Sequence, residues 1–227
     1  MMTETRRKPR QKRAKEKVDR ILDTVEELVT ELRIEDLTTT QIAERTGLAV
    51  GTIYQYFGNR TELLIAAEVR MFERLAAKLA GEFFKVMSEP ADDPIAEIIG
   101  IYIESAKAQP GYIQLLRFSV VNKPPGVNEA TVDEFTGDMV SAFIRQQIPD
   151  ISDSQIEVTR KTVINILSVL CDLVLLTKDP DIQARIQAEL VAHCKFALYR
   201  AANPDMECPF AESLRLAQLS DGEAAGS

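Results

Sequence analysis

Hydroxyl-bearing and small residues that could contact another molecule gather between residues 38 and 60. They occupy outward positions of two short predicted helices and of the start of a third, at Thr39, Thr40, Val50, Gly51, Thr52, Tyr54, Tyr56 and Arg60. Hydroxyls, helix-start amides and a guanidinium bind phosphates, and Thr or Tyr can reach base edges. Val50 could touch a thymine methyl, and Gly51 would allow close backbone approach. These residue types suit contact with duplex DNA rather than the making or breaking of bonds.

Two short helices joined by a tight turn are predicted to position these residues. Thr38 and Gln41 have the spacing of a capping box, which predicts a helix start at Thr38. Gly47 can adopt the positive φ that a tight turn requires, and Leu48 is an apolar plug inside the turn. A second helix follows over residues 50–57. A helix-turn-helix of this kind lays its second helix in the major groove.

Apolar and aromatic residues at helical spacing more often form core than a contact surface. Ile53 and Phe57 are therefore assigned to the core. Tyr54 and Tyr56 are interpreted as outward contacts, with core packing as the alternative. Gly51 has no good structural explanation, because glycine inside a helix costs roughly 1 kcal/mol relative to alanine.

A basic segment precedes the first long helix. Residues 6–17 hold eight basic residues and one acidic residue, although the whole chain has a net charge of -8. Such a segment could follow the minor groove as an arm, and the alternative is a disordered solubilising extension. The acidic excess lies in residues 61–227, so the two parts of the chain are expected to have different electrostatic roles.

The segments Leu37–Ala43, Gly51–Phe57 and Arg60–Leu63, with Gly47 between the first two, resemble the TetR (tetracycline repressor) family. The resemblance implies a nine-helix, two-domain dimer that represses transcription until a ligand enters its larger domain. It also implies DNA contacts at the eight residues named above. The chain departs from the family pattern at Ala49 and Val50, where serine and a polar or basic residue are usual, and at Arg60, where lysine is usual.

The apolar spacing is helical almost throughout, which predicts an all-α fold. Helices are predicted at 11–33, 39–46, 50–57, 60–88, 94–108, 111–121, 128–147, 153–177 and 180–202. We divide the chain into a basic arm (1–17), a three-helix helix-turn-helix DNA-binding domain (18–60), a larger ligand-binding and dimerisation domain (61–203) and a tail (204–227).

Residues 156–198 are predicted to form a homodimer interface. The segment Val163–Leu176 is apolar nearly all round, which favours packing against both its own domain and a partner in a four-helix interface. The alternative is a central core helix. A dimer would place two recognition helices in successive major grooves of a roughly palindromic operator.

The larger domain is predicted to bind an unidentified small molecule. The long helix that starts near Arg60 is predicted to couple this pocket to the spacing of the two recognition helices. The candidate pocket residues are Phe72, Tyr102, Tyr112, Leu116, Phe118, Phe135, Met139, Phe143 and Asn165. Aromatic and methionine residues of amphipathic helices are more often core, which is the alternative for each of them. Arg117, Asn122 and Asp138 could add polar specificity.

Other classes of protein fit the sequence less well. It has no nucleophile–base pattern, phosphate loop or metal-ligand spacing, so we expect no enzyme, cofactor or metal; its single histidine, His193, is interpreted as an interface or surface residue. Three cysteines at unrelated spacings and no membrane-length apolar run favour a cytoplasmic protein. An activator, a ligandless regulator or a helical adaptor that binds only protein are the remaining alternatives.

Overall fold

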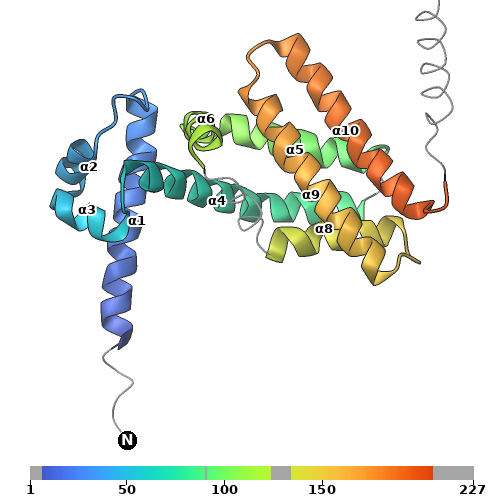
Figure 1. Ribbon diagram of the computed structural model, residues 1–227, viewed down its shortest axis with the longest axis horizontal. Coiled ribbons are helices and arrows are strands. Elements are labelled where there is room, and N and C mark those ends of the chain that lie inside the picture. Colours follow the sequence, from blue (N-terminus) through green and yellow to red (C-terminus); the bar gives the residue numbers. More distant parts are fainter. Residues whose placement is uncertain (1–6, 90, 124–133, 207–227) are drawn as a thin grey trace, which may run out of the picture.

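The computed structural model describes the backbone of residues 7–89, 91–123 and 134–206, and the side chains of these residues except 7–11 and 134–136. Within these ranges the chain forms nine helices and no strand (Figure 1). The predicted all-α fold is therefore confirmed for the described residues.

Three helices form the small N-terminal part: α1 (Arg7–Glu31), α2 (Thr39–Thr46) and α3 (Val50–Tyr56). Their apolar faces meet in a common core, in which Val25 of α1, Ile42 of α2 and Ile53 of α3 are at most 1% exposed. Figure 1 shows α2 and α3 on the same side of α1. This arrangement leaves the outer faces of α2 and α3 open.

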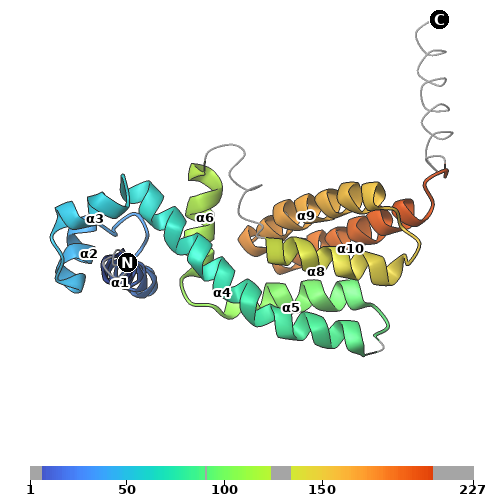
Figure 2. The ribbon, with the colours of Figure 1, turned by 90° about the horizontal axis from the view of Figure 1, so that it is seen from below.

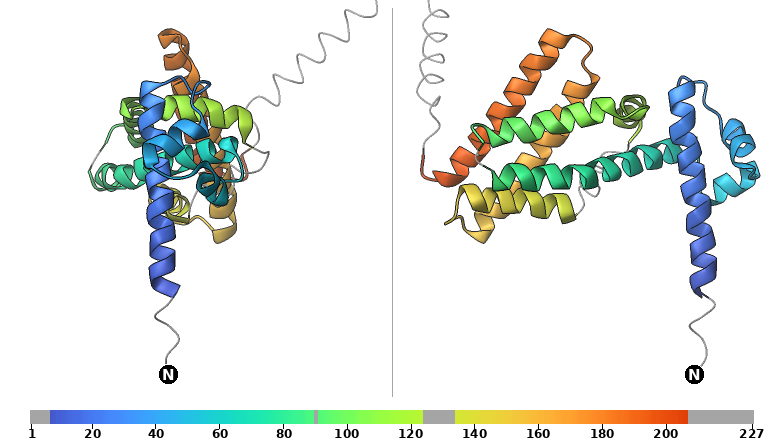
Figure 3. Two further views of the ribbon diagram at one scale, coloured as in Figure 1. Left: turned by 90° about the vertical axis from the view of Figure 1, so that its left-hand side faces the viewer. Right: turned by 180° about the vertical axis from the view of Figure 1, so that it is seen from behind.

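The long helix α4 (Arg60–Ser88) joins the small part to the larger one (Figure 2). It has 29 residues, which corresponds to about 43 Å at the usual helical rise. The larger part contains α5 (Pro94–Ala108), α6 (Tyr112–Asn122), α8 (Glu134–Gln147), α9 (Asp153–Leu176) and α10 (Pro180–Ala202). Viewed from behind, α1 stands across the end of α4 that is distant from α10 (Figure 3).

The helix ends follow local capping rules. Asn59, Asp93, Ser152 and Asp179 each accept a hydrogen bond from a backbone N–H in the first turn of the following helix. Helices α5 and α10 also carry proline in the first turn, where the missing N–H costs nothing. These signals explain why nearly all described helix ends lie within two residues of their predicted positions.

The start of α1 differs from its prediction. We expected a helix from residue 11 behind a separate arm, whereas α1 begins at Arg7. The basic stretch from residue 7 to 17 is thus a helical extension of α1, and Figure 1 shows this half of α1 reaching past α2, α3 and α4. Residues 1–6 of the arm, 128–133 of the predicted seventh helix and 207–227 of the tail lie outside the described residues.

None of the described helices combines the length and the apolar character needed to cross a membrane.

Candidate DNA-binding surface and ligand cavity

A capping box orients the start of α2. The Gln41 amide N–H donates to Thr38 Oγ1 over 3.3 Å, and the Thr38 N–H donates to Gln41 Oε1 over 2.7 Å. The side chains of these two residues therefore satisfy each other's backbone. The box leaves Thr39 half-buried and Thr40 exposed at the first turn of α2.

The turn between α2 and α3 is built as the sequence predicts. Gly47 has φ +68°, a left-handed conformation that favours glycine, and its N–H closes the end of α2. The Leu48 N–H donates to the Ala43 carbonyl over 3.1 Å. Thr46 is buried, and its hydroxyl donates to the Ile42 carbonyl over 2.8 Å. These contacts fix the angle between the two short helices.

The outer face of α3 carries most of the predicted contact residues. Tyr54 is 46% exposed, and its hydroxyl oxygen lies 3.2 Å from that of Thr39 on α2. Val50, Thr52 and Tyr56 are half-buried, and Val50 and Tyr56 also pack against the core. The structure therefore brings Thr39 and Tyr54 together at the centre of one polar face.

Gly51 is exposed on the same face of the molecule. A Cβ atom added to it would have no neighbouring atom within 4 Å. The fold therefore gives no internal steric reason for glycine at this position, although glycine weakens the helix. Ala49 caps α3 without a side-chain hydrogen bond, so α3 lacks the stabilisation that a serine would provide.

Arg60 has partners that the sequence did not predict. Its Nε donates to the Leu37 carbonyl over 2.7 Å, and an Nη2–H donates to the Ile34 carbonyl. Its guanidinium also lies over the ring of Phe118 in α6, 5.6 Å from the ring centre. Arg60 thus connects the loop before α2 to α6, and the predicted phosphate contact depends on its remaining N–H groups.

The cap at the start of α4 differs from the capping box of α2. Asn59 Oδ1 accepts a hydrogen bond from the Glu62 N–H over 2.9 Å. The Glu62 carboxylate, however, accepts from the Gly58 N–H over 3.0 Å and from the Asn59 side chain over 2.8 Å, rather than from the Asn59 backbone.

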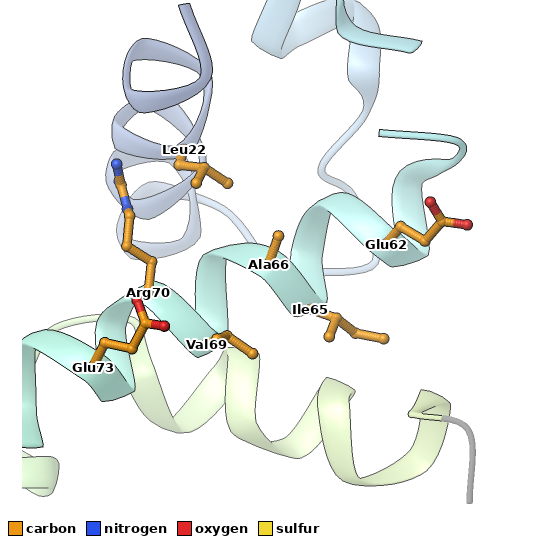
Figure 4. Close-up of a pocket in the computed structure, with 7 residues that line it drawn as sticks. All are labelled: Leu22, Glu62, Ile65, Ala66, Val69, Arg70 and Glu73. Atoms are coloured by element: carbon orange, nitrogen blue, oxygen red, sulfur yellow. The ribbon is translucent and has the colours of Figure 1, made fainter. Parts of the chain in front are cut away.

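A charged cluster holds α1 against α4. Arg70 of α4 reaches Glu26 at 2.6 Å and Asp23 at 2.8 Å, and its side chain is 16% exposed. Figure 4 shows Arg70 pointing toward α1, with Ile65 and Val69 on the side of α4 nearer to α6. The groove drawn there has a volume of about 470 Å³ and lies at the junction of the small and large parts.

A larger cavity of about 670 Å³ lies among α4, α5, α6, α8 and α9. It is lined by five of the predicted ligand-binding residues, Phe72, Tyr102, Tyr112, Leu116 and Met139. Binding by these residues stays a prediction.

Three further predicted residues do not line this cavity. Phe118 lies under Arg60, Phe143 packs against the ring of Phe83, and Asn165 is exposed and donates to the Lys161 carbonyl. The side chain of Phe135 lies outside the described residues. Arg117, Asn122 and Asp138 are exposed and do not line the cavity either.

One wall of the cavity is polar, and sequence reasoning missed it. Glu68 of α4 is 3% exposed; its Oε2 lies 2.8 Å from Lys123 Nζ and accepts from the Ser119 hydroxyl over 3.2 Å. Asp172 of α9 lines the same cavity. Burial and, to a smaller extent, the nearby Glu68 carboxylate raise the pKa of the Asp172 carboxyl to about 6, and Lys123 opposes this rise. Glu68 and Asp172 are each a charged residue on the apolar face of a helix. This pattern was the sequence signal that could have indicated a polar group inside the larger domain.

The tyrosines and cysteines near this wall are kept neutral. Burial raises the pKa of both Tyr102 and Tyr112 well above the usual range. It raises the pKa of the Cys171 thiol to about 12 and that of Cys194 to about 11. Neither thiol is therefore an activated nucleophile at neutral pH. Over the described part of the chain, no group of three His, Cys, Asp or Glu residues is arranged to hold a metal ion.

Large apolar side chains remain exposed on α9 and α10. They are Val158, Val169 and Leu173 on α9, and Ile182, Phe196 and Tyr199 on α10. His193 of α10 is exposed and contacts the Glu189 carbonyl at 2.7 Å. These two helices are the ones predicted to form the dimer.

Comparison with known proteins places residues 21–67 in the family model described as bacterial regulatory proteins, tetR family. The HTH-type transcriptional repressor KstR of Rhodococcus jostii (strain RHA1) is 39% identical over 64 residues, which are 28% of this chain and 30% of that repressor. A KstR from Mycolicibacterium smegmatis is also 39% identical over 64 residues, 28% of this chain and 31% of its own. The chain thus spans about a third of the length of the curated relatives it matches.

Solved structures share the fold over a greater length. A TetR transcriptional regulator from Rhodococcus sp. RHA1 is 17% identical with a TM-score of 0.53, covering 84% of this chain and 97% of its own. RolR, solved in complex with resorcinol, is 18% identical with a TM-score of 0.52, covering 87% of this chain and 98% of its own. The family model matches the segment that contains the helix-turn-helix, and the fold of the solved regulators matches over most of the chain, so residues 21–67 are similar in sequence to the bacterial regulatory proteins of the tetR family.

Proposed function

We propose that this protein is a sequence-specific repressor of transcription that binds a roughly palindromic operator as a homodimer and leaves it when a small molecule binds. The observation that carries the proposal is the open face of α2 and α3, where the Thr39 and Tyr54 hydroxyls lie 3.2 Å apart and Gly51 is exposed. The KstR relatives, which match over this segment, are named as repressors. Because the target is chromosomal DNA, the protein would act in the cytoplasm.

DNA contact would use the eight predicted residues in different ways. Thr39 and Thr40 would offer amides and hydroxyls to a phosphate at the start of α2, whose dipole favours negative charge. Gly51 would let the backbone of α3 approach the groove, and Val50, Thr52, Tyr54 and Tyr56 would contact base edges or phosphates. The exposed basic side chains from Lys12 to Lys17 would add contacts along the α1 extension.

Dimerisation would use the exposed apolar side chains of α9 and α10. Phe196 is 46% exposed and Val169 is 64% exposed, on adjacent long helices. Two such helices from each protomer can pack as a four-helix interface. The resulting two-fold axis would present two α3 helices to major grooves about 34 Å apart.

Ligand release would act through α6 as well as α4. The Tyr112 and Leu116 side chains of α6 line the cavity. Gln114 of the same helix donates to the Val29 carbonyl at the end of α1 over 2.9 Å, and Phe118 lies under Arg60. A ligand that shifts α6 would therefore change the position of the helix-turn-helix. The coupling free energy between ligand binding and DNA binding is about 1–3 kcal/mol in typical cases. RolR, which has this fold, was solved with resorcinol.

The experiment that tests the proposal is selection of bound sequences from random duplex DNA with the purified full chain. We expect enrichment of one palindrome, and binding that weakens steeply with salt because phosphate contacts release counterions. Tyr54→Ala should abolish the enrichment, and Phe84→Ala, which removes an exposed aromatic side chain of α4, should keep it.

Two results would overturn the proposal. Equal weak binding to every sequence would leave the helical adaptor that binds only protein. Enrichment of a palindrome, with reporter expression that rises when the protein occupies it, would make the protein an activator.

A further inference from the structure

The cavity is mostly apolar and has one wall on which polar groups gather. Its apolar walls come from all five surrounding helices and include Phe72, Leu79, Ile99, Leu116 and Leu176. Three of its four charged residues, Glu68, Lys123 and Asp172, interact with one another on this wall. The fourth, the exposed Glu82, lies about four helical turns from Glu68 along α4. A molecule that fills this space must therefore be mostly apolar and carry its polar group at one place.

The charges on the polar wall do not balance. Glu68 and Lys123 form an ion pair of 2.8 Å, and the Lys123 side chain is 14% exposed. Asp172 is a second carboxylate, and among the described groups only Glu68 and Lys123 affect it electrostatically, with no hydrogen bond to hold its charge. One negative charge on the wall is left without a counter-charge of its own.

Both contacts of Glu68 use the same oxygen. The Lys123 ammonium and the Ser119 hydroxyl each contact Oε2, so Oε1 and the two oxygens of Asp172 are the acceptors left on this wall. An acceptor in an apolar cavity is costly to leave without a hydrogen-bond donor. A charged donor forms a stronger hydrogen bond with it than a neutral donor does.

Resting on the proposed function, we propose that the ligand of this repressor is an elongated apolar molecule with one protonated amine, which is bound by the carboxylates of Asp172 and Glu68. An amine supplies the donors that the free oxygens lack and the positive charge that the wall lacks. The rings of Tyr102 and Tyr112 also line the cavity and can attract a cation by their faces.

An anionic ligand fits this wall less well. A carboxylate beside Lys123 would have to compete with Glu68 for an ammonium that is already paired, and it would meet the charge of Asp172. Two negative charges inside a low-dielectric cavity repel each other more strongly than they would in water.

Calorimetric titration of the full chain with decylamine, decanol and decanoate tests the inference, because these probes share one chain and differ in the head group. We expect decylamine to bind about tenfold or more tightly than decanol, because a hydrogen bond to a charged group exceeds a neutral one. Decanoate should bind most weakly. Decanol or decanoate equal to or tighter than decylamine would overturn the inference, and so would no detectable binding of any of the three.

A matched pair of variants assigns the effect to the cavity. Asp172→Asn removes the unbalanced charge and should reduce decylamine affinity about tenfold while leaving decanol unchanged. Glu157→Gln removes an exposed carboxylate of the same helix, paired with Lys161, and should change neither. Equal loss of decylamine affinity in both variants, or none in Asp172→Asn, would contradict the assignment.

Operator binding without any probe separates this inference from the proposed function. Tight decylamine binding by a chain that selects no palindrome would support the ligand class and reject the repressor. A chain that binds an operator but prefers decanol or decanoate would keep the repressor and reject the amine.

Discussion

The hydroxyl oxygens of Thr39 and Tyr54 lie 3.2 Å apart and join the start of α2 to the outer face of α3. The two residues are 15 positions apart in the chain, and the capping box at Thr38 and the turn at Gly47 bring them together. Both side chains are held in place before any partner arrives. A preorganised pair of this kind loses less conformational entropy on binding than two mobile side chains would.

Tyr54→Phe should weaken operator binding by about tenfold, because a hydrogen bond to a charged phosphate is worth roughly 1.5 kcal/mol or more. The thermal stability should stay unchanged, because the lost bond is exposed. Fluorescence anisotropy with labelled operator measures the first effect and a thermal melt the second. Ser88→Ala removes an exposed hydroxyl from the end of α4 and serves as the control; equal affinity of the two variants would argue against contact by the Tyr54 hydroxyl.

Gly51→Ala should make the protein more stable and the operator complex weaker. The added methyl has open space around it, and alanine favours a helix by up to about 1 kcal/mol over glycine. On the DNA-facing surface, the same methyl would hold the α3 backbone away from the groove. Urea denaturation measures the gain in stability and anisotropy measures the loss of affinity.

Gly81→Ala is the control for this pair of effects. Gly81 lies within α4, is exposed and also has no atom within 4 Å of an added Cβ. We expect a similar gain in stability with unchanged operator affinity. If Gly51→Ala also kept full affinity, close approach of α3 to DNA would be rejected.

Arg60→Lys should destabilise the protein by about 1–2 kcal/mol, because lysine keeps the charge but cannot reproduce the planar fork on two carbonyls. In the structure that fork connects Leu37 and Ile34 to the ring of Phe118. Urea denaturation of Arg60→Lys measures the loss, with Arg13→Lys on the exposed α1 extension as the control. A stable Arg60→Lys variant with weakened operator binding would instead make Arg60 mainly a phosphate contact, because lysine lacks the bidentate geometry of arginine.

The helix-turn-helix could be predicted from the sequence because its signals are local. Thr38 with Gln41 defines the start of α2, and Gly47 is needed for the left-handed turn, whatever the rest of the chain does. The same holds for the prolines at the starts of α5 and α10. The outward position of Tyr54 follows from its place on a short helix whose inner face is set by Ile53.

The ligand cavity depends on distant packing and was predicted only in part. Phe143 was a reasonable candidate by residue type, but its ring faces Phe83 of α4. Glu68 and Asp172 were passed over because charged residues of amphipathic helices usually face solvent. Their true position depends on how α4, α6 and α9 meet, which helical spacing does not encode. The carbonyl partners of Arg60 could not be predicted for the same reason, because they lie more than 20 residues away in the chain.

Asp172→Asn should stabilise the protein at pH 7.5 by on the order of 1–2 kcal/mol. The pKa of Asp172 in the folded chain, about 6, lies above that of an unfolded aspartate. The folded state therefore binds this proton more tightly than the unfolded chain does. The stability contributed by Asp172 falls as the pH rises from the pKa of the unfolded aspartate through the folded value of about 6. The titratable groups around it are Glu68 on α4, Tyr102 on α5, Tyr112 on α6, Lys123 directly after α6, and Cys171 on α9.

Urea denaturation at pH 7.5 and pH 5 measures this effect. The advantage of Asp172→Asn should shrink at pH 5, where the wild-type carboxyl is largely protonated. Glu157→Gln should show no such gain, because that exposed carboxylate has a pKa lowered by Lys161. A pH-independent difference between Asp172→Asn and wild type would mean that Asp172 is not the group that titrates.

Phe196→Asp should convert the proposed dimer to a monomer and reduce operator affinity on the order of a hundredfold. The aspartate would place an unpaired charge in an apolar four-helix interface, which destabilises the dimer. A monomer has one recognition helix and so loses the affinity gained from bivalent binding. Light scattering gives the mass in solution, and anisotropy gives the affinity. Phe84→Asp is the matched control, because Phe84 is 58% exposed but lies on α4, away from the proposed interface. A dimeric Phe196→Asp, or a Phe84→Asp that becomes monomeric, would place the interface elsewhere than on α9 and α10.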